Sequence, residues 1–141
     1  MPGADWSTKP LGDELGEALR AELLGWPAVH VRRVMGTVAF YRNRYMLGCY
    51  INRELFRKAQ KPSWANRPGE PPLVWVRLRS ADAEHALKRP GVRRQGVSFA
   101  RWVEIPLASR ASLAEAVRWL GCAYERPART QPKRRRTRNP R

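Results

Sequence analysis

The stretch RWVEIPLASRASLAEAVRWLGCAYER, residues 101–126, decides the fold because it holds a strand, a turn and a helix in succession. Residues 102–107 alternate in character, which is the pattern of a half-buried strand, and Pro106 favours the end or edge of a sheet. One phase of this strand holds Val103, Ile105 and Leu107, and the other holds Trp102 and Glu104.

The second half of the same stretch predicts a helix. Ser112 is followed three residues later by Glu115, which is the spacing of a capping box, so we expect the helix to begin at Ser112. Its apolar stripe, at spacings of three and four, consists of Leu113, Ala116, Val117, Leu120 and Tyr124. This stripe would cover the apolar phase of the strand before it, which predicts two packed layers.

Working outward, the chain shows further helical and alternating patterns separated by breaks. We expect a helix over 11–25, two strands that meet near Gly36 with a bulge at Arg32–Arg33, a returning strand over 45–51, a strand over 73–79, a helix over 81–89 capped by Ser80, and a further strand within 92–99. Residues 59–72 contain four prolines and one glycine, and we expect an exposed loop that lengthens a hairpin.

We expect the element order α-β-β-β-α-β-β-α, which predicts a single two-layer α+β domain. Its antiparallel sheet would carry the helices on one face and leave the other face open to solvent. The domain would span 11–125, after a loose arm at 1–10 and before a basic tail at 126–141 that is disordered when free.

The net charge of +16 is concentrated in two zones. Residues 32–101 hold sixteen Lys and Arg against four acids, and residues 126–141 hold eight against none. Arginine outnumbers lysine 23 to 5, and guanidinium groups suit bidentate contact with phosphate. A GC-rich genome produces the same bias without selection for phosphate binding, so both explanations stand.

Few residues offer catalytic or metal-binding chemistry. His30 and His85 have no ligand-type neighbour at the required spacing, and Cys49 and Cys122 lie in apolar segments typical of a core. No nucleophile-elbow or nucleotide-cradling motif occurs. We therefore expect a non-enzymatic protein without metal or cofactor and, since no leader or membrane-spanning pattern is present, a cytoplasmic one without a membrane partner.

Several short motifs resemble a group of small α/β families. Residues 26–29 (WPAV) resemble a W-P-G-V entry, residues 34–40 (VMGTVAF) resemble an F-G-G-V-x-F strand with departures at Met35 and Thr37, and 101–103 with 116–126 resemble a closing W-V strand and aliphatic helix. The group comprises the YjbR-like proteins, the TfoX N-terminal domain and the uncharacterised bacterial "luciferase domain" family. The resemblance implies a non-catalytic fold, with DNA binding proposed for YjbR-like members and competence regulation for TfoX-like ones.

Two groups of residues are candidates for binding nucleic acid. In the first, Trp75, Arg77 and Arg79 share one strand phase, and Trp102 with Tyr41 and Tyr45 could lie on the same open face. The basic candidates beyond that face are Arg93 and Arg94 in the domain and Lys133, Arg134, Arg135, Arg136 and Arg138 in the tail. Alternatively, Trp75 and Trp102 pack against the loop at 59–72 or a second subunit, and the tail is a solubilising polycation.

The leading hypothesis is therefore a nucleic-acid-binding or regulatory protein that uses a basic Arg/Trp sheet face and a polybasic tail, on DNA rather than RNA. The alternative is a protein-interaction module whose sheet face forms a homodimer or binds a partner. A third class, an enzyme acting on an anionic small molecule, has the least support in the sequence.

Overall fold

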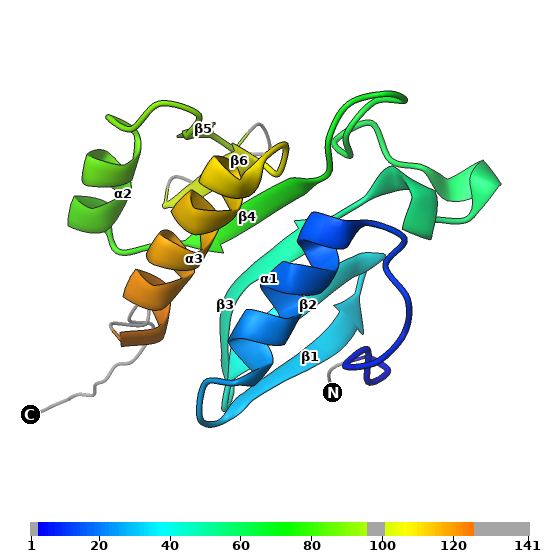
Figure 1. Cartoon of the computed structure of the whole chain (residues 1–141), viewed down its shortest axis with the longest axis horizontal. Helices are drawn as coiled ribbons and strands as arrows, with labels where there is room; N and C mark the ends of the chain where they lie inside the picture. Colours follow the sequence, from blue (N-terminus) through cyan, green and yellow to red (C-terminus); the bar gives the residue numbers. More distant parts are fainter. Residues whose placement is uncertain (1–2, 96–100, 126–141) are drawn as a thin grey trace, which may run out of the picture.

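The computed structural model describes residues 3–95 and 101–125 and has the predicted α+β architecture (Figure 1). The described part forms a six-stranded antiparallel sheet in the order β1-β2-β3-β4-β6-β5. Four strands precede the second helix, one more than the expected element order has. The strands are β1 Val29–Val34, β2 Thr37–Arg42, β3 Tyr45–Ile51, β4 Leu73–Arg77, β5 Arg93–Arg94 and β6 Trp102–Pro106. The helices are α1 Glu14–Leu24, α2 Ser80–Ala86 and α3 Arg110–Glu125, with short 3-10 turns η1 Arg53–Leu55 and η2 Lys58–Gln60.

One face of the sheet, here called the helix face, is covered by α1 and α3. In Figure 1 α1 lies across β1 to β3, and α3 lies across β4 and β6. The inward phases of the strands predicted from alternation are confirmed, since Val38, Phe40, Val103 and Ile105 are fully buried in this core. The predicted stripe of α3 is confirmed too: Ala116 and Leu120 are fully buried, and Leu113, Val117 and Tyr124 pack against the core.

The start of α3 differs from the prediction. The helix begins at Arg110, and the Ser109 hydroxyl accepts a hydrogen bond from the Ser112 backbone N–H at 3.2 Å. Ser112 Oγ in turn accepts from the Ser109 backbone N–H at 2.8 Å, so a serine takes the place that Glu has in the usual capping box. Glu115 instead pairs with Arg89 at 3.0 Å, which joins the turn after α2 to α3.

The first helix is shorter than expected and is tied to the sheet at its first turn. Asp13 caps α1 by accepting from the Gly16 N–H at 2.9 Å, and the same carboxylate accepts from the Tyr50 hydroxyl at 2.9 Å. A Cβ on Gly16 would lie 2.7 Å from the Tyr50 ring, so glycine permits the close approach of α1 to β3.

Two details around the second helix also differ. The α2 helix spans Ser80–Ala86 and its N-cap is Arg79, without a side-chain cap, so Ser80 is the first helical residue rather than the cap. Of the strand expected within 92–99, only β5 Arg93–Arg94 forms among the described residues, and 96–100 lie outside them.

The β1–β2 hairpin has no bulge at Arg32–Arg33, because the pairing from Val29 to Val34 is continuous. The register shifts instead between Phe40 and Tyr41, where β2 pairs with β3. The alternation of apolar and polar residues is interrupted in the sequence because Arg33, a charged residue, stands on the same strand phase as the buried Val31. Its guanidinium donates to the Leu55 carbonyl and lies 4.3 Å from the centre of the Trp6 ring, which accounts for a cation at that position.

The N-terminal arm, expected to be loose, is held along β1. The Trp6 N–H donates to the Val31 carbonyl at 3.0 Å, and the Arg33 N–H donates to the Ala4 carbonyl at 2.8 Å. Asp5 bridges Arg32 in antiparallel fashion between these bonds. The arm was underestimated because main-chain pairing leaves no apolar period in the sequence.

The opposite face, here called the loop face, is only partly open, contrary to the prediction. The connection between β3 and β4 does lengthen a hairpin, as predicted, but it folds back onto this face. Ala65 is buried there against Ile51 and Leu73, with Phe56 and Trp64 packed beside them. The proline-rich composition was expected to exclude any regular element from residues 59–72, but the 3-10 turn η2 at Lys58–Gln60 enters this segment. The loop also buries apolar side chains that its composition does not reveal.

A turn before β1 offers a direct test of local strain. The Val29 N–H donates to the Trp26 carbonyl at 3.3 Å, with Pro27 and Ala28 between them and Ala28 at φ +67°. That φ at the third position of a type II turn favours glycine. We expect Ala28→Gly to raise the free energy of unfolding by about 0.5–1 kcal/mol, measured by urea denaturation.

The control for this prediction is the same exchange at Ala21, which is exposed within α1. Ala21→Gly should lower the free energy of unfolding by about 0.5–1 kcal/mol, because glycine is a poor residue in a helix interior. Destabilisation by both exchanges would contradict the turn assignment.

Candidate nucleic-acid interface

An apolar hollow of about 340 Å³, here called the tryptophan cup, opens on the loop face. Its lining consists of Val34, Met35, Thr37, Met46, Cys49, Trp64, Trp75, Gln95 and Trp102. The volume lies at the lower end of the range for ligand pockets, about 300–1,000 Å³. The β3–β4 register pairs Cys49 with Trp75 in the floor, while Met35 stands on the rim with 85% of its surface exposed.

Trp75, predicted to be exposed, is buried. Its indole Nε1 donates to Glu104 Oε1 at 2.9 Å, and its ring centre lies 5.4 Å from that of Trp64. The alternative that Trp75 packs against the loop at 59–72 is therefore confirmed, whereas Trp102 is only half-buried. The hydrogen bond and the loop contact fix the orientation of the Trp75 ring, so it forms a rigid part of the floor of the tryptophan cup.

Glu104 also determines what Arg93 can do. The two side chains form an ion pair across β5 and β6, in which Arg93 Nε donates to Glu104 Oε2 at 2.5 Å. Arg93 was predicted to contact phosphate, but its charge is offset by a carboxylate that is itself almost buried. Arg94 is exposed beside it.

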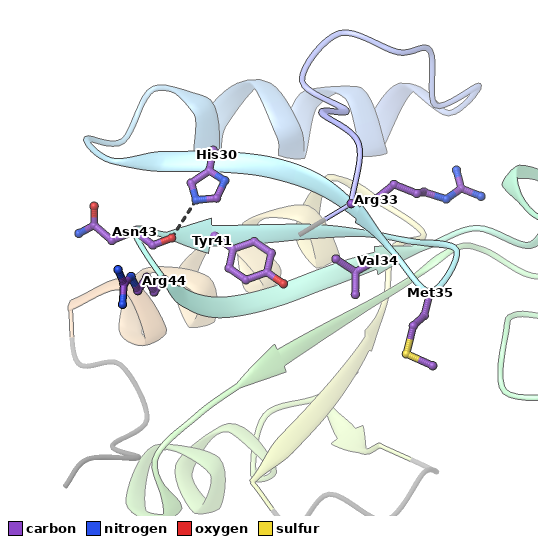
Figure 2. A pocket seen from close by; sticks show the side chains of 8 residues that line it. His30, Arg33, Val34, Met35, Tyr41, Asn43 and Arg44 are labelled. Atoms are coloured by element: carbon purple, nitrogen blue, oxygen red, sulfur yellow. Dashed lines mark hydrogen bonds between the residues drawn. The ribbon is translucent and has the colours of Figure 1, made fainter. Parts of the chain in front are cut away.

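A second hollow of about 840 Å³, here called the edge groove, adjoins the tryptophan cup and shares Val34 and Met35 with it. Figure 2 shows the His30 and Tyr41 rings on neighbouring strands, with Arg44 at the β2–β3 turn and Met35 at the other end. The two rings are stacked at 5.3 Å and 10° between planes, and His30 Nε2 lies 2.8 Å from the Asn43 carbonyl oxygen. Arg33 also lines this hollow, but its side chain points away from the two rings.

A third hollow of about 380 Å³, here called the loop hollow, lies on the other side of Trp64. Trp64 lines both this hollow and the tryptophan cup. The cations of the loop hollow are Arg67, Arg93 and Arg94, and its acids are Glu70 and Glu104. The three hollows therefore follow one another across the loop face, with the apolar one between two that carry arginine.

Charge is divided between the two layers of the domain. The residues of α1, α2 and α3 include seven acids and three cations, a net charge of −4. The strands and connections up to residue 125 include five acids and seventeen cations, a net charge of +12. An anionic ligand would therefore favour the sheet and its loops over the helix layer.

The other predicted site residues are scattered. Arg77 is half-buried and pairs with Trp102 across β4 and β6. The two side chains therefore lie on the same face of the sheet, as predicted. Arg79 lies beyond the end of β4, at the N-cap of α2, and so does not share that face. Tyr41 does lie on the loop face, but Tyr45 pairs with Arg42, whose guanidinium stacks 4.5 Å from the Tyr124 ring of α3, so Tyr45 belongs to the helix face.

The tail candidates Lys133, Arg134, Arg135, Arg136 and Arg138 lie outside the described residues. Sequence reasoning missed Met35, Met46 and Trp64 in the tryptophan cup and Arg44 in the edge groove. The sequence did contain one signal that the loop packs on the sheet, namely Trp64. A tryptophan inside a proline-rich loop needs an apolar surface to cover it.

Two titratable groups near the tryptophan cup have raised pKa values. Burial raises the pKa of Cys49 to about 12, so the thiol stays protonated near neutral pH. Burial also raises the pKa of Tyr41. Among residues 3–95 and 101–125, no three His, Cys, Asp or Glu side chains gather as a metal site would require.

None of the helices within the described ranges is long and apolar enough to cross a membrane. No protein-family model, no curated protein and no solved structure matches this chain, so the resemblance to YjbR-like and TfoX-like families stays a prediction.

Proposed function

We propose that the protein is a non-enzymatic nucleic-acid-binding protein that uses the loop face together with its basic tail. The observation that carries this proposal is the run of three hollows, in which arginines flank an apolar cup of tryptophans. Nucleic-acid strands present the complementary pattern, since charged phosphates alternate with apolar base faces. The +12 charge of the strands and connections supports the same class of partner.

The last turn of α3 is held by hydrogen bonds to β2 and to the turn before β1. Arg42 donates to the Tyr124 carbonyl at 2.5 Å, and the Tyr124 hydroxyl donates to the Pro27 carbonyl at 2.8 Å. The end of α3 is thereby fixed beside the β2–β3 turn, which contributes Asn43 and Arg44 to the edge groove. Eight further cations follow in sequence after Glu125, and they would add phosphate contacts to those of the loop face.

The test removes exposed cations from the two flanking hollows. The pair Arg44→Gln and Arg94→Gln should reduce the steepness of the salt dependence by about two units in a plot of log affinity against log salt, because about one counterion is released per phosphate contact. Fluorescence anisotropy with a labelled DNA strand over a salt series would measure this slope.

A matched control removes two charges elsewhere. Lys88 and Arg118 are both exposed outside the three hollows, and Arg118 lies on α3. Lys88→Gln with Arg118→Gln should leave the slope nearly unchanged. Equal slopes for the two double variants would mean that binding follows net charge alone and would overturn the assignment to the loop face.

A protein-interaction module is the second candidate, favoured by the exposure of Met35 beside an apolar hollow. Size-exclusion chromatography of the intact chain separates the two. A dimer that Met35→Gln converts to a monomer, together with no binding of duplex or single strand at about 50 mM salt, would favour the interaction module.

A further inference from the structure

We infer that the tryptophan cup receives one unstacked base of a single strand, while the flanking hollows hold phosphates on either side of it. This inference rests on the proposed function and specifies its ligand as single-stranded nucleic acid. The reason lies in the lining: three indoles and two methionine thioethers surround the hollow, and none of them offers a charge to a phosphate. Such surfaces suit the flat, polarisable face of a base.

The position of the tryptophan cup favours a nucleic-acid strand over a free aromatic ligand. Val34 and Met35 are shared with the edge groove, and Trp64 is shared with the loop hollow. A base in the cup therefore has neighbouring hollows on both sides for the phosphates that precede and follow it. Arg44 stands in one and Arg67 and Arg94 stand in the other, so a continuous strand uses all three while a free base uses one.

The cup is largely preformed. Trp75 is held by Glu104 and Trp64, and the Thr37 hydroxyl donates to the Val34 carbonyl at 2.7 Å. Because the Thr37 hydroxyl proton is already used within the protein, the Gln95 amide is the main polar side chain of the lining that a base edge could meet. We therefore expect stacking with weak base preference, and preference for single strands over duplex, whose bases are already stacked.

Met35 adds an independent indication. It adopts φ +52° in the tight turn between β1 and β2, and 85% of its surface is exposed. A non-glycine residue in that conformation carries backbone strain, and its exposed side chain recovers little of it by packing. An apolar side chain held on the rim of an aromatic cup is placed to close over a bound base.

The deciding experiment compares two labelled strands of equal length and charge on the full chain at about 50 mM salt, conditions under which phosphate contacts are strong. One strand is oligothymidylate, and the other has the same backbone with every base removed. We expect the abasic strand to bind about tenfold more weakly or worse, in line with the contribution of a stacked base. We also expect oligothymidylate, and not the abasic strand, to quench tryptophan fluorescence.

Variants of Trp102 assign the effect to the cup. Trp102→Leu should weaken oligothymidylate binding to nearly the level of the abasic strand and leave abasic binding unchanged, whereas Trp102→Phe retains a ring and should recover most of the loss. Leu24→Ala, at an exposed position on α1, is the control and should change neither. Thermal denaturation of each variant shows that the fold is retained.

The outcomes separate this inference from the proposed function. If both strands bind equally, or if Trp102→Leu weakens both to the same extent, the base does not enter the cup although phosphate binding stands. If neither strand binds, the proposed function fails and the inference fails with it.

Discussion

Leu120→Ala should lower the free energy of unfolding by about 2–5 kcal/mol, measured by urea denaturation. Leu120 is fully buried on α3, and a Cβ placed on Gly48 of β3 would lie 3.0 Å from its Cδ2 atom. The leucine therefore packs directly on the backbone of a central strand. Truncation would leave a cavity that neither the sheet nor the helix can close by a side-chain movement alone.

The control is another leucine truncated on the same helix layer. Leu24 at the end of α1 is 36% exposed, and Leu24→Ala should cost less than about 1 kcal/mol. If Leu120→Ala cost no more than Leu24→Ala, the packing of α3 on the sheet would be assigned to the wrong face.

Affinity for duplex DNA should fall roughly a thousandfold between about 50 and 200 mM salt if about six phosphates are engaged. The expectation follows from two sources of charge: residues 126–141 supply eight cations, and residues 1–125 supply a net charge of +8. Truncation after Glu125 should reduce the slope of log affinity against log salt by several units. Binding by the domain alone should persist at low salt.

Truncation should leave the fold intact, because α3 closes the core before the tail begins and Arg42 already holds the last turn of α3. Thermal denaturation of the truncated chain checks this. A truncated protein that keeps the full slope would place all phosphate contacts on the domain. One that loses binding even at low salt would place them all on the tail.

The helix face of this fold could be predicted from the sequence, because its residues follow local periods. Val103 and Ile105 alternate with Glu104, and Leu120 recurs with Ala116 at the helical spacing, so each element shows which side it buries. The covering of the loop face could not be predicted in this way. Trp64 meets Trp75 only because a long connection folds back, and no period in the chain encodes that contact.

The candidate site was predicted in part, for a related reason. Alternation correctly placed Trp75, Arg77 and Trp102 on one face, because each strand keeps its phase. It could not show that Glu104 accepts from the Trp75 indole, since that bond joins residues 29 positions apart across neighbouring strands. Alternation placed Glu104 only on the same strand phase as Trp102, whereas the structure shows that its carboxylate also holds the Trp75 ring of the tryptophan cup.

The arm paired along β1 has a consequence for how the molecules behave in a crowded solution. The Val31 carbonyl and the Arg33 N–H point outward from the sheet and are occupied by Trp6 and Ala4 of the same chain. Without the arm, these groups would form an open template onto which the strand of another molecule could add. Residues 4–6 thus cover the outer edge of β1 and block the edge-to-edge addition of another molecule's strand there.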